Sequence, residues 1–425
     1  MGTGIVITGI GTVCAFGVGL DTLWSALSEG RCGVRRLTRM SPEGFRVHFG
    51  GEVPEYAAKD HVPKAYRKAV KVMARCTELA VGAAREAVRD SGLVTREASF
   101  DASEATATTY PAPRVGCHIG AGLIAAEAAE LASALATSRE SEGGPFSVRV
   151  WGTTGMGNLQ PLWLLKYLPN MLACQVGIIH GAEGPSNTIT CAEASGLLSL
   201  GESARTIVRG AADVCLSGGG ESKLNHVALN RMDLSGRLAR VSDDVEPSEI
   251  VRPYDAGSPG AVLGEGAGIL VLERAESARG RGAKVYASIE GFGAGQASIA
   301  ALDRGEPDEG LAGAIEGAMR EAGLEAGDLG AVVALGQGVP SLDRAEAGGL
   351  REALGEAGER LPRVTLVRSV GNCMAGHSAL MAGVGAKMAS EGVLPGGGSI
   401  AGKGILICTG SMGGQAAAMV LRSGG

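Results

Sequence analysis

A strand that ends in glycine and leads into a helical segment occurs twice in this chain, and this repetition limits the folds it can adopt. The first copy is "GIVITGIGTV" at residues 4–13, and the second is "VYASIEGFGAG" at residues 285–295. Strand-like and helical runs also alternate along the rest of the sequence, which is typical of α/β proteins. The sequence therefore predicts an α/β fold built from two related halves, residues 1–275 and residues 276–425.

Helices with one apolar face are predicted in both halves. In the first half, small and apolar side chains recur at spacings of three and four residues, at Ala69, Met73, Cys76, Ala80, Ala83 and Ala87. In the second half, Leu311, Ile315 and Met319 share one helical face, and Gly323 is expected to end that helix.

Two further segments have distinct compositions. Residues 96–114 are small, polar and proline-bearing, so they are expected to form an exposed insertion. The segment 162–172, "LWLLKYLPNML", is apolar and is predicted to be helical until Pro169 interrupts it.

Composition excludes several classes of protein. No apolar run reaches the roughly 18 residues that a membrane span needs, and the residues before the first strand lack the pattern of a secretory signal, so none is expected. The nine cysteines are scattered without a C-x-x-C pair, which favours reduced thiols in the cytoplasm and argues against a zinc site. The net charge of −6 gives no reason to expect nucleic-acid binding.

The stretch "NTITCAEASGLLSLG", residues 187–201, places a carboxylate at an unusual point. Thr188, Ile189 and Thr190 predict a short strand, and an apolar helix is expected to begin around Gly196. Glu193 therefore lies in the turn between strand and helix, where the positive end of the helix dipole favours an anion.

Three segments resemble the β-ketoacyl-acyl-carrier-protein synthases, the condensing enzymes of the thiolase fold. They are "GAEGPSNTITCAEASGLLSLGESARTIVRGAADVCLSGGGES" at 181–222, "RPYDAGSPGAVLGEGAGILVLE" at 252–273 and "GQGVPSLDRAEAGGL" at 336–350. The resemblance extends over nearly the whole chain. It implies a five-layered α-β-α-β-α fold, no metal and no cofactor.

The positions that carry catalysis in this family have changed here. The nucleophilic cysteine corresponds to Glu193, the first histidine to Leu335 and the second histidine to Cys373. The family lysine corresponds to Arg368, and the phenylalanine that gates the acyl channel corresponds to Met412. Cys191 and His377 lie close by in sequence, but neither occupies a catalytic position of the motif.

Condensation requires a thiolate that carries the acyl chain and donors that stabilise an enolate. A chain with glutamate and leucine at these positions is not expected to condense acyl units on its own. The loss resembles the chain-length factors of type II polyketide systems, which usually carry glutamine in place of the cysteine and pair with an active synthase subunit.

This resemblance implies a catalytic ketosynthase partner in a heterodimer and an acyl carrier protein as a second partner. The strand Asn187–Cys191 would pair across the subunit boundary. Trp163, Leu164, Tyr167 and Met171 would border the interface and the tunnel end, with ordinary core packing as the alternative.

Carrier docking is assigned to Lys64, Arg67 and Lys68, which share a helical spacing with Lys71 and Arg75; a solvated helix surface is the alternative.

Two other functions stay open: a synthase or malonyl decarboxylase that works through Glu193 or Cys373, and a homodimeric protein that binds acyl groups or their carrier. The sequence does not distinguish an aromatic polyketide, a polyene or a modified fatty acid as the product.

Overall fold

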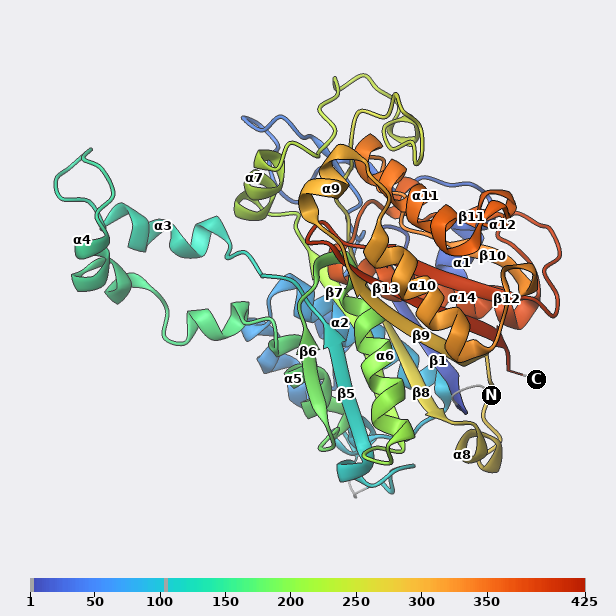
Figure 1. Ribbon diagram of the computed structural model, residues 1–425. Coiled ribbons are helices and arrows are strands. Elements are labelled where there is room, and N and C mark those ends of the chain that lie inside the picture. Colours follow the sequence, from blue (N-terminus) through green and yellow to red (C-terminus); the bar gives the residue numbers. More distant parts are fainter. Residues whose placement is uncertain (1–3, 103–105, 425) are drawn as a thin grey trace.

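The computed structural model describes residues 4–102 and 106–424 and is a mixed α/β fold around one large sheet (Figure 1). The strand order is β11-β10-β12-β13-β9-β1-β8-β7-β5-β6, with β2 paired to β1. The main strands are β1 (Ile5–Cys14), β5 (Val115–Gly120), β6 (Ser186–Ile189), β7 (Val214–Ser222), β8 (Glu265–Arg274), β9 (Ala287–Gln296), β10 (Leu329–Val333), β12 (Gly404–Gly410) and β13 (Gln415–Ser423). The short strands are β2 (Gly17–Val18), β11 (Arg363–Val364) and the separate pair β3 (Arg35–Arg36) and β4 (Phe49–Gly50).

Helices cover the outer faces of the sheet and also lie between its two halves. The longer ones are α1 (Leu20–Ser28), α2 (Arg75–Ser91), α3 (Ala128–Ala136), α5 (Met171–His180), α6 (Ser195–Val208), α7 (His226–Leu234), α10 (Glu309–Ala322), α11 (Pro340–Leu354) and α14 (His377–Glu391). The shorter ones are α4 (Val148–Thr153), α8 (Ala275–Gly280), α9 (Ile299–Arg304), α12 (Glu356–Arg360) and α13 (Val367–Val370). Among the 3₁₀ segments are η2 (Lys64–Val72), η6 (Trp163–Tyr167) and η7 (Ala192–Ala194).

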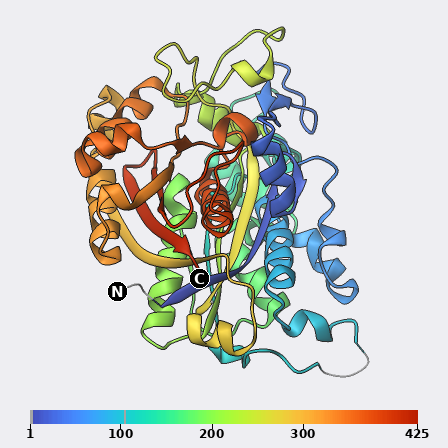
Figure 2. The same cartoon turned by 90° about the vertical axis from the view of Figure 1, so that its right-hand side faces the viewer.

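The elements form five layers. Helices α6 and α14 pack against strands of both halves, α2 and α5 cover the outside of the first half, and α10 and α11 cover the second. Figure 2 shows α14 end-on between the red and orange strands of the second half and the yellow and blue strands of the first. The halves join where β1 pairs antiparallel with β9 over Ile5–Ile7 and Ala287–Ile289. The predicted α-β-α-β-α arrangement is confirmed, while the exact boundary near residue 275 stays a prediction.

The repeated glycine-rich strands have a common physical reason. Gly11 on β1 lies directly under α2, and a Cβ there would collide with the backbone carbonyl of Ala83. Gly293 on β9 lies in the same way under α10, and a Cβ there would collide with the carbonyl of Ala314. Each half therefore uses glycine to let an outer helix approach its strand closely.

Some predicted boundaries are wrong. The apolar spacing from Ala69 to Ala87 does not form one helix, because η2 ends at Val72, the backbone at Met73 is extended and α2 begins only at Arg75. The predicted interruption at Pro169 is confirmed, because η6 ends at Tyr167 and α5 begins only at Met171. Gly323 ends α10 in the left-handed conformation, as predicted.

The predicted insertion at 96–114 is mostly exposed or half-buried where it is described, and residues 103–105 lie outside the described part. Tyr110 attaches this segment to the sheet, because its hydroxyl donates to the buried carboxylate of Glu273 at 2.7 Å. No helix in the described ranges 4–102 and 106–424 combines the length and apolarity needed to cross a membrane.

Residues 121–170, here called the arm, extend away from the sheet with α3 and α4 at their far end (Figure 1). The arm exposes many large apolar side chains, namely Leu123, Leu135, Phe146, Val148, Met156, Leu162, Leu164 and Leu165. Strand β6 lies at the edge of the sheet and pairs only with β5 among the described strands.

Candidate functional site

Glu193 lies in a tight elbow between β6 and α6. The preceding residue, Ala192, has φ +46°, a left-handed conformation that is strained for a residue with a Cβ. Ser195 holds the turn: its hydroxyl accepts the N–H of Cys191 at 2.8 Å and donates to the carbonyl of Ala192 at 2.7 Å. The expected strand-turn-helix geometry is therefore present, with α6 beginning at Ser195.

The carboxyl group of Glu193 is enclosed by the protein. Its Oε1 accepts from the Asn372 amide at 3.0 Å, and its Oε2 accepts from the Met412 backbone N–H at 3.2 Å. The backbone carbonyl of Glu193 also accepts from the Ser378 hydroxyl at 2.6 Å. The residue has 0% exposed surface, so no open face of the carboxyl group remains for a substrate.

Burial is the largest influence on this carboxyl group and raises the pKa of Glu193. The hydrogen bonds from Asn372 and Met412 act in the opposite direction, and the nearby charge of Glu221 adds to the increase. Glu193 is thus an internal group with both carboxyl oxygens hydrogen-bonded.

Leu335 brings no polar chemistry to the site. Its side chain is 1% exposed in the apolar core, and its backbone N–H donates to Glu346 at 3.1 Å. The adjacent cavity, lined by Leu335, Asp343, Glu346 and Ser411 among others, has a volume of about 20 Å³. That space holds one water molecule and is too small for an acyl unit.

Cys373 and His377 do not form an activated pair. Cys373 is 0% exposed, its Sγ faces the carbonyls of Val370 and Gly371 at 3.8 and 3.7 Å, and burial raises its thiol pKa well above the ordinary value. Burial lowers the pKa of His377 to about 4, and its Nδ1 accepts the Cys373 backbone N–H at 3.3 Å. The imidazole nitrogen next to the cysteine is therefore occupied and cannot act as its base.

Arg368 is separated from this site. It is exposed on α13, and its Nε donates to the carbonyl of Ser248 at 3.0 Å. The structure therefore does not bring the residue at the family lysine position to Glu193, while it does bring Met412 there through its backbone.

The residues predicted at the interface and tunnel divide into two groups. Tyr167 and Met171 are buried within this chain at 6% and 8% exposure, and the Tyr167 hydroxyl donates to Glu130 at 2.6 Å. Trp163 packs at the edge of the same core, and Leu164 is 56% exposed on the arm.

The predicted basic stripe is partly wrong. Lys64, Arg67, Lys68 and Lys71 are exposed on η2, whose three-residue turns do not place them on one α-helical face. Arg75 belongs to α2 and points inward, where its guanidinium donates to the buried Glu265 at 2.8 Å.

Sequence reasoning missed the groups that hold Glu193: Asn372, Ser378 and the Met412 N–H. Asn372 gave a signal, because it stands where the family motif K-S-x-x-G-H has glycine. The other two depend on the fold alone. Among the described residues, no group of three or more His, Cys, Asp or Glu side chains is arranged to hold a metal ion.

The layered sheet and the elbow at Glu193 define a ketosynthase-type protein of the thiolase-like fold. Residues 3–278 match the β-ketoacyl synthase N-terminal domain and residues 286–391 match the β-ketoacyl synthase C-terminal domain, so the chain belongs to the β-ketoacyl synthase family.

Curated relatives include a 3-oxoacyl-[acyl-carrier-protein] synthase 2 of Staphylococcus aureus (strain COL), 34% identical over 88% of this chain and 81% of the relative. A Vibrio cholerae protein with the same description is 32% identical over the same shares.

Solved structures support the same fold. The ishigamide ketosynthase/chain length factor superposes with a TM-score of 0.79 at 25% identity, covering 99% of this chain and 98% of that one. A β-ketoacyl synthase from Burkholderia phymatum STM815 gives 0.78 at 24% identity, with 99% of both chains covered. A type II PKS ketosynthase in complex with its acyl-carrier protein gives 0.77 at 20% identity, covering 99% and 98%.

Proposed function

We propose that this chain is a non-catalytic ketosynthase subunit of the chain-length-factor kind, which pairs with an active β-ketoacyl synthase and shapes its acyl tunnel. The observation that carries the proposal is the enclosed carboxyl group of Glu193, whose two oxygens are taken by Asn372 and Met412. A glutamate has no sulfur with which to form a thioester, and its enclosed carboxyl group is not accessible to an acyl group.

The remaining groups needed for condensation are also lacking at their family positions. Leu335 cannot donate to an enolate, and the thiol of Cys373 is buried with a raised pKa. Losing one such donor typically costs about 100- to 1,000-fold in rate. The similarity to the ishigamide ketosynthase/chain length factor adds support from an independent direction.

Partner binding is assigned to the edge of β6 and to the apolar side chains of the arm, including Leu164. An edge strand offers unpaired backbone groups to a second chain, and a large exposed apolar patch favours association. Carrier docking is assigned to Lys64, Arg67 and Lys68, because these exposed cations complement an acidic carrier protein.

The test measures carbon–carbon bond formation from acyl- and malonyl-carrier substrates. The purified chain alone is expected to be inactive, and Glu193→Cys is expected to stay inactive because Leu335 and Cys373 still supply no enolate donors. Co-expression with a cysteine-bearing ketosynthase is expected to give a stable heterodimer that forms product.

Each alternative gives a different result in the same experiment. Turnover or a covalent acyl adduct on the isolated chain would establish a synthase or decarboxylase instead. Acyl binding by a lone homodimer, with no complex formed on co-expression, would establish a binding protein.

A further inference from the structure

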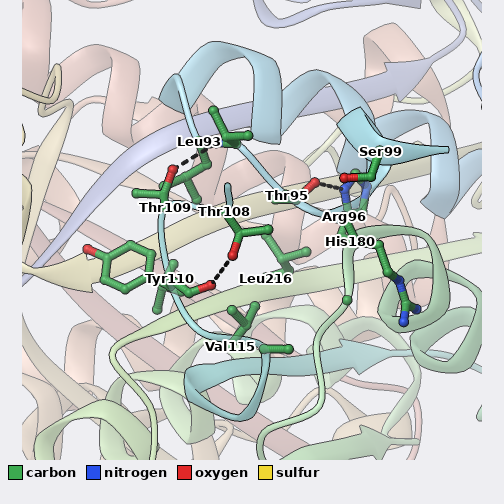
Figure 3. A pocket seen from close by; sticks show the side chains of 14 residues that line it. Leu93, Thr95, Arg96, Ser99, Thr108, Thr109, Tyr110, Val115, His180 and Leu216 are labelled. Carbon is green, nitrogen blue, oxygen red and sulfur yellow. Dashed lines mark hydrogen bonds between the residues drawn. The ribbon is translucent and has the colours of Figure 1, made fainter. Parts of the chain in front are cut away.

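Another cavity lies far from Glu193 and is lined in part by residues of the segments 93–99 and 108–112 (Figure 3). It has a volume of about 160 Å³, and its apolar wall is formed by Leu93, Val115, Val214 and Leu216, all of which are buried. An apolar cavity of about 150 Å³ in another protein binds benzene, so this one has room for a six-membered ring.

The cavity is separate from the Glu193 site because of the sheet topology. Val115 and Val214 begin the parallel strands β5 and β7, whereas Glu193 follows the carboxyl end of β6, which is parallel to β5. Six residues of strand place the two ends roughly 20 Å apart. A molecule in this cavity would therefore not touch the elbow.

One buried polar group in the cavity wall lacks a partner. His180 is 2% exposed, and its Nδ1 is bonded to the Thr95 hydroxyl at 2.9 Å, the contact drawn in Figure 3. Its Nε2 has no hydrogen-bond partner within the described part of the chain. A buried polar atom without a partner is costly, so a ligand that supplies one gains affinity.

The charges around the cavity are already neutralised. Burial lowers the pKa of His180 to about 3, so the imidazole is neutral, although Glu97 lies 3.8 Å from Nδ1. Arg96, at the rim, donates to the carbonyl of Ile178 and pairs with Glu183 at 3.6 Å. The cavity therefore offers no free charge to an ionic ligand.

We propose that this cavity binds a small, neutral, hydroxyl-bearing ring compound of the size of phenol, with the ring against Val214 and Leu216 and the hydroxyl on His180 Nε2. A hydroxyl both donates and accepts, so it satisfies Nε2 in either tautomer of the neutral imidazole. This ligand site is independent of the proposed subunit role.

The test compares phenol with toluene, which has nearly the same shape but no hydroxyl. Binding is measured on the full chain by ligand titration with detection of methyl chemical shifts. The methyl groups of Leu93, Val115 and Leu216 are expected to shift, while those of Leu335 stay unchanged. Phenol is expected to bind about fivefold more tightly than toluene, the factor that one hydrogen bond typically gives.

Three variants make the result specific. Val214→Phe fills the cavity and is expected to abolish binding of both probes. His180→Phe removes the polar partner and is expected to equalise the two affinities, while His180→Gln, which can still donate and accept, is expected to keep the preference for phenol. The melting temperature of each unliganded variant shows whether it is folded.

The proposal is overturned if neither probe shifts the cavity methyl groups, or if the preference for phenol survives in a folded His180→Phe. It is equally overturned if a folded Val214→Phe binds the probes as well as the native chain does.

Discussion

One buried carboxyl group holds the loop that carries Leu335. Glu346 accepts the backbone N–H groups of Leu335 and Gly336 at 3.1 and 2.9 Å, and the hydroxyl of Tyr254 at 2.7 Å. Burial raises the pKa of Glu346 to about 7, and this cause outweighs the hydrogen bonds that favour its ionised form. The loop is therefore held by a group that titrates close to neutral pH.

This titration predicts a pH-dependent stability. The folded protein binds the Glu346 proton more tightly than the unfolded chain, so the free energy of unfolding falls as the pH rises from about 4.5 to about 7. The loss is on the order of 3 kcal/mol at about 1.4 kcal/mol per pKa unit. In Glu346→Gln this contribution is absent, so the stability difference between native and variant chains should shrink from pH 5 to pH 8.

Urea unfolding at several pH values measures that difference. Asp343, whose pKa burial raises to about 6, contributes in the same direction and is kept in both chains. Its charge also raises the pKa of Glu346, so the comparison measures the contribution of Glu346 together with its coupling to Asp343. A difference that stays constant over this pH range would contradict the assignment.

Cys373 is predicted to be chemically inert in the folded chain. Its thiol has no exposed surface and a raised pKa, so very little thiolate is available to an alkylating reagent. Timed labelling with iodoacetamide followed by peptide mass spectrometry should modify the exposed Cys174 first and Cys373 only after unfolding. Rapid labelling of Cys373 in the native chain would support the alternative of a relocated nucleophile.

At the residue scale, the sequence predicts the position of a residue in its local turn better than the contacts that its side chain makes. The neighbouring motif residues place Glu193 in its elbow correctly, because the strand and helix patterns on both sides are local. The environment of Arg75 could not be predicted, since its partner Glu265 is 190 positions away in sequence. Arg368 matches the family lysine in sequence, yet its own short helix directs it toward Ser248.

At the scale of elements, the glycines of the central strands are predicted to be irreplaceable. Gly293→Ala would place a methyl group against the carbonyl of Ala314, so β9 and α10 would have to separate. The expected loss of stability is about 3 kcal/mol, as for other overpacked cores. Thermal and urea unfolding of the purified variant measure it.

Gly313 provides a matched control on the same helix. It lies on the exposed face of α10, and no described atom outside its own helical turn lies within 4 Å of the place that an added methyl group would take. Gly313→Ala should stabilise the chain by about 0.5–1 kcal/mol, because alanine is the better helix former. Equal effects of the two substitutions would show that close approach is not what selects glycine on β9.

The start of α2 could not be predicted from the sequence. Apolar residues at spacings of three and four fit a continuous helix from Ala69 onward, but they fit equally a 3₁₀ segment that is followed by an extended turn. The second structure is the one that forms, with Val70 and Met73 buried in the core beside α2. This burial depends on tertiary packing, which the local spacing does not reveal. The helix ending at Gly323 was predictable because its cap is local.

At the scale of the whole molecule, the surface is divided between a closed body and an apolar arm. Helices cover the faces of the sheet around α6 and α14, whereas Leu162 and Leu164 are 78% and 56% exposed on the arm. If the arm binds a second subunit, charge placed there should disrupt assembly without affecting the fold of the single chain.

The double variant Leu162→Glu/Leu164→Glu is therefore expected to weaken the heterodimer at least tenfold, or about 1.4 kcal/mol. Two carboxylates buried in an interface without partners lose their hydration, whereas in the free chain they remain in water.

Leu234→Glu is the control, because Leu234 is 79% exposed at the end of α7, outside the arm. Analytical ultracentrifugation of the co-expressed subunits measures the affinity, and melting temperatures of the isolated variants verify the fold. If the control weakens assembly as much as the double variant does, the interface lies elsewhere; if neither does, the arm has another role and the edge of β6 becomes the surface to test.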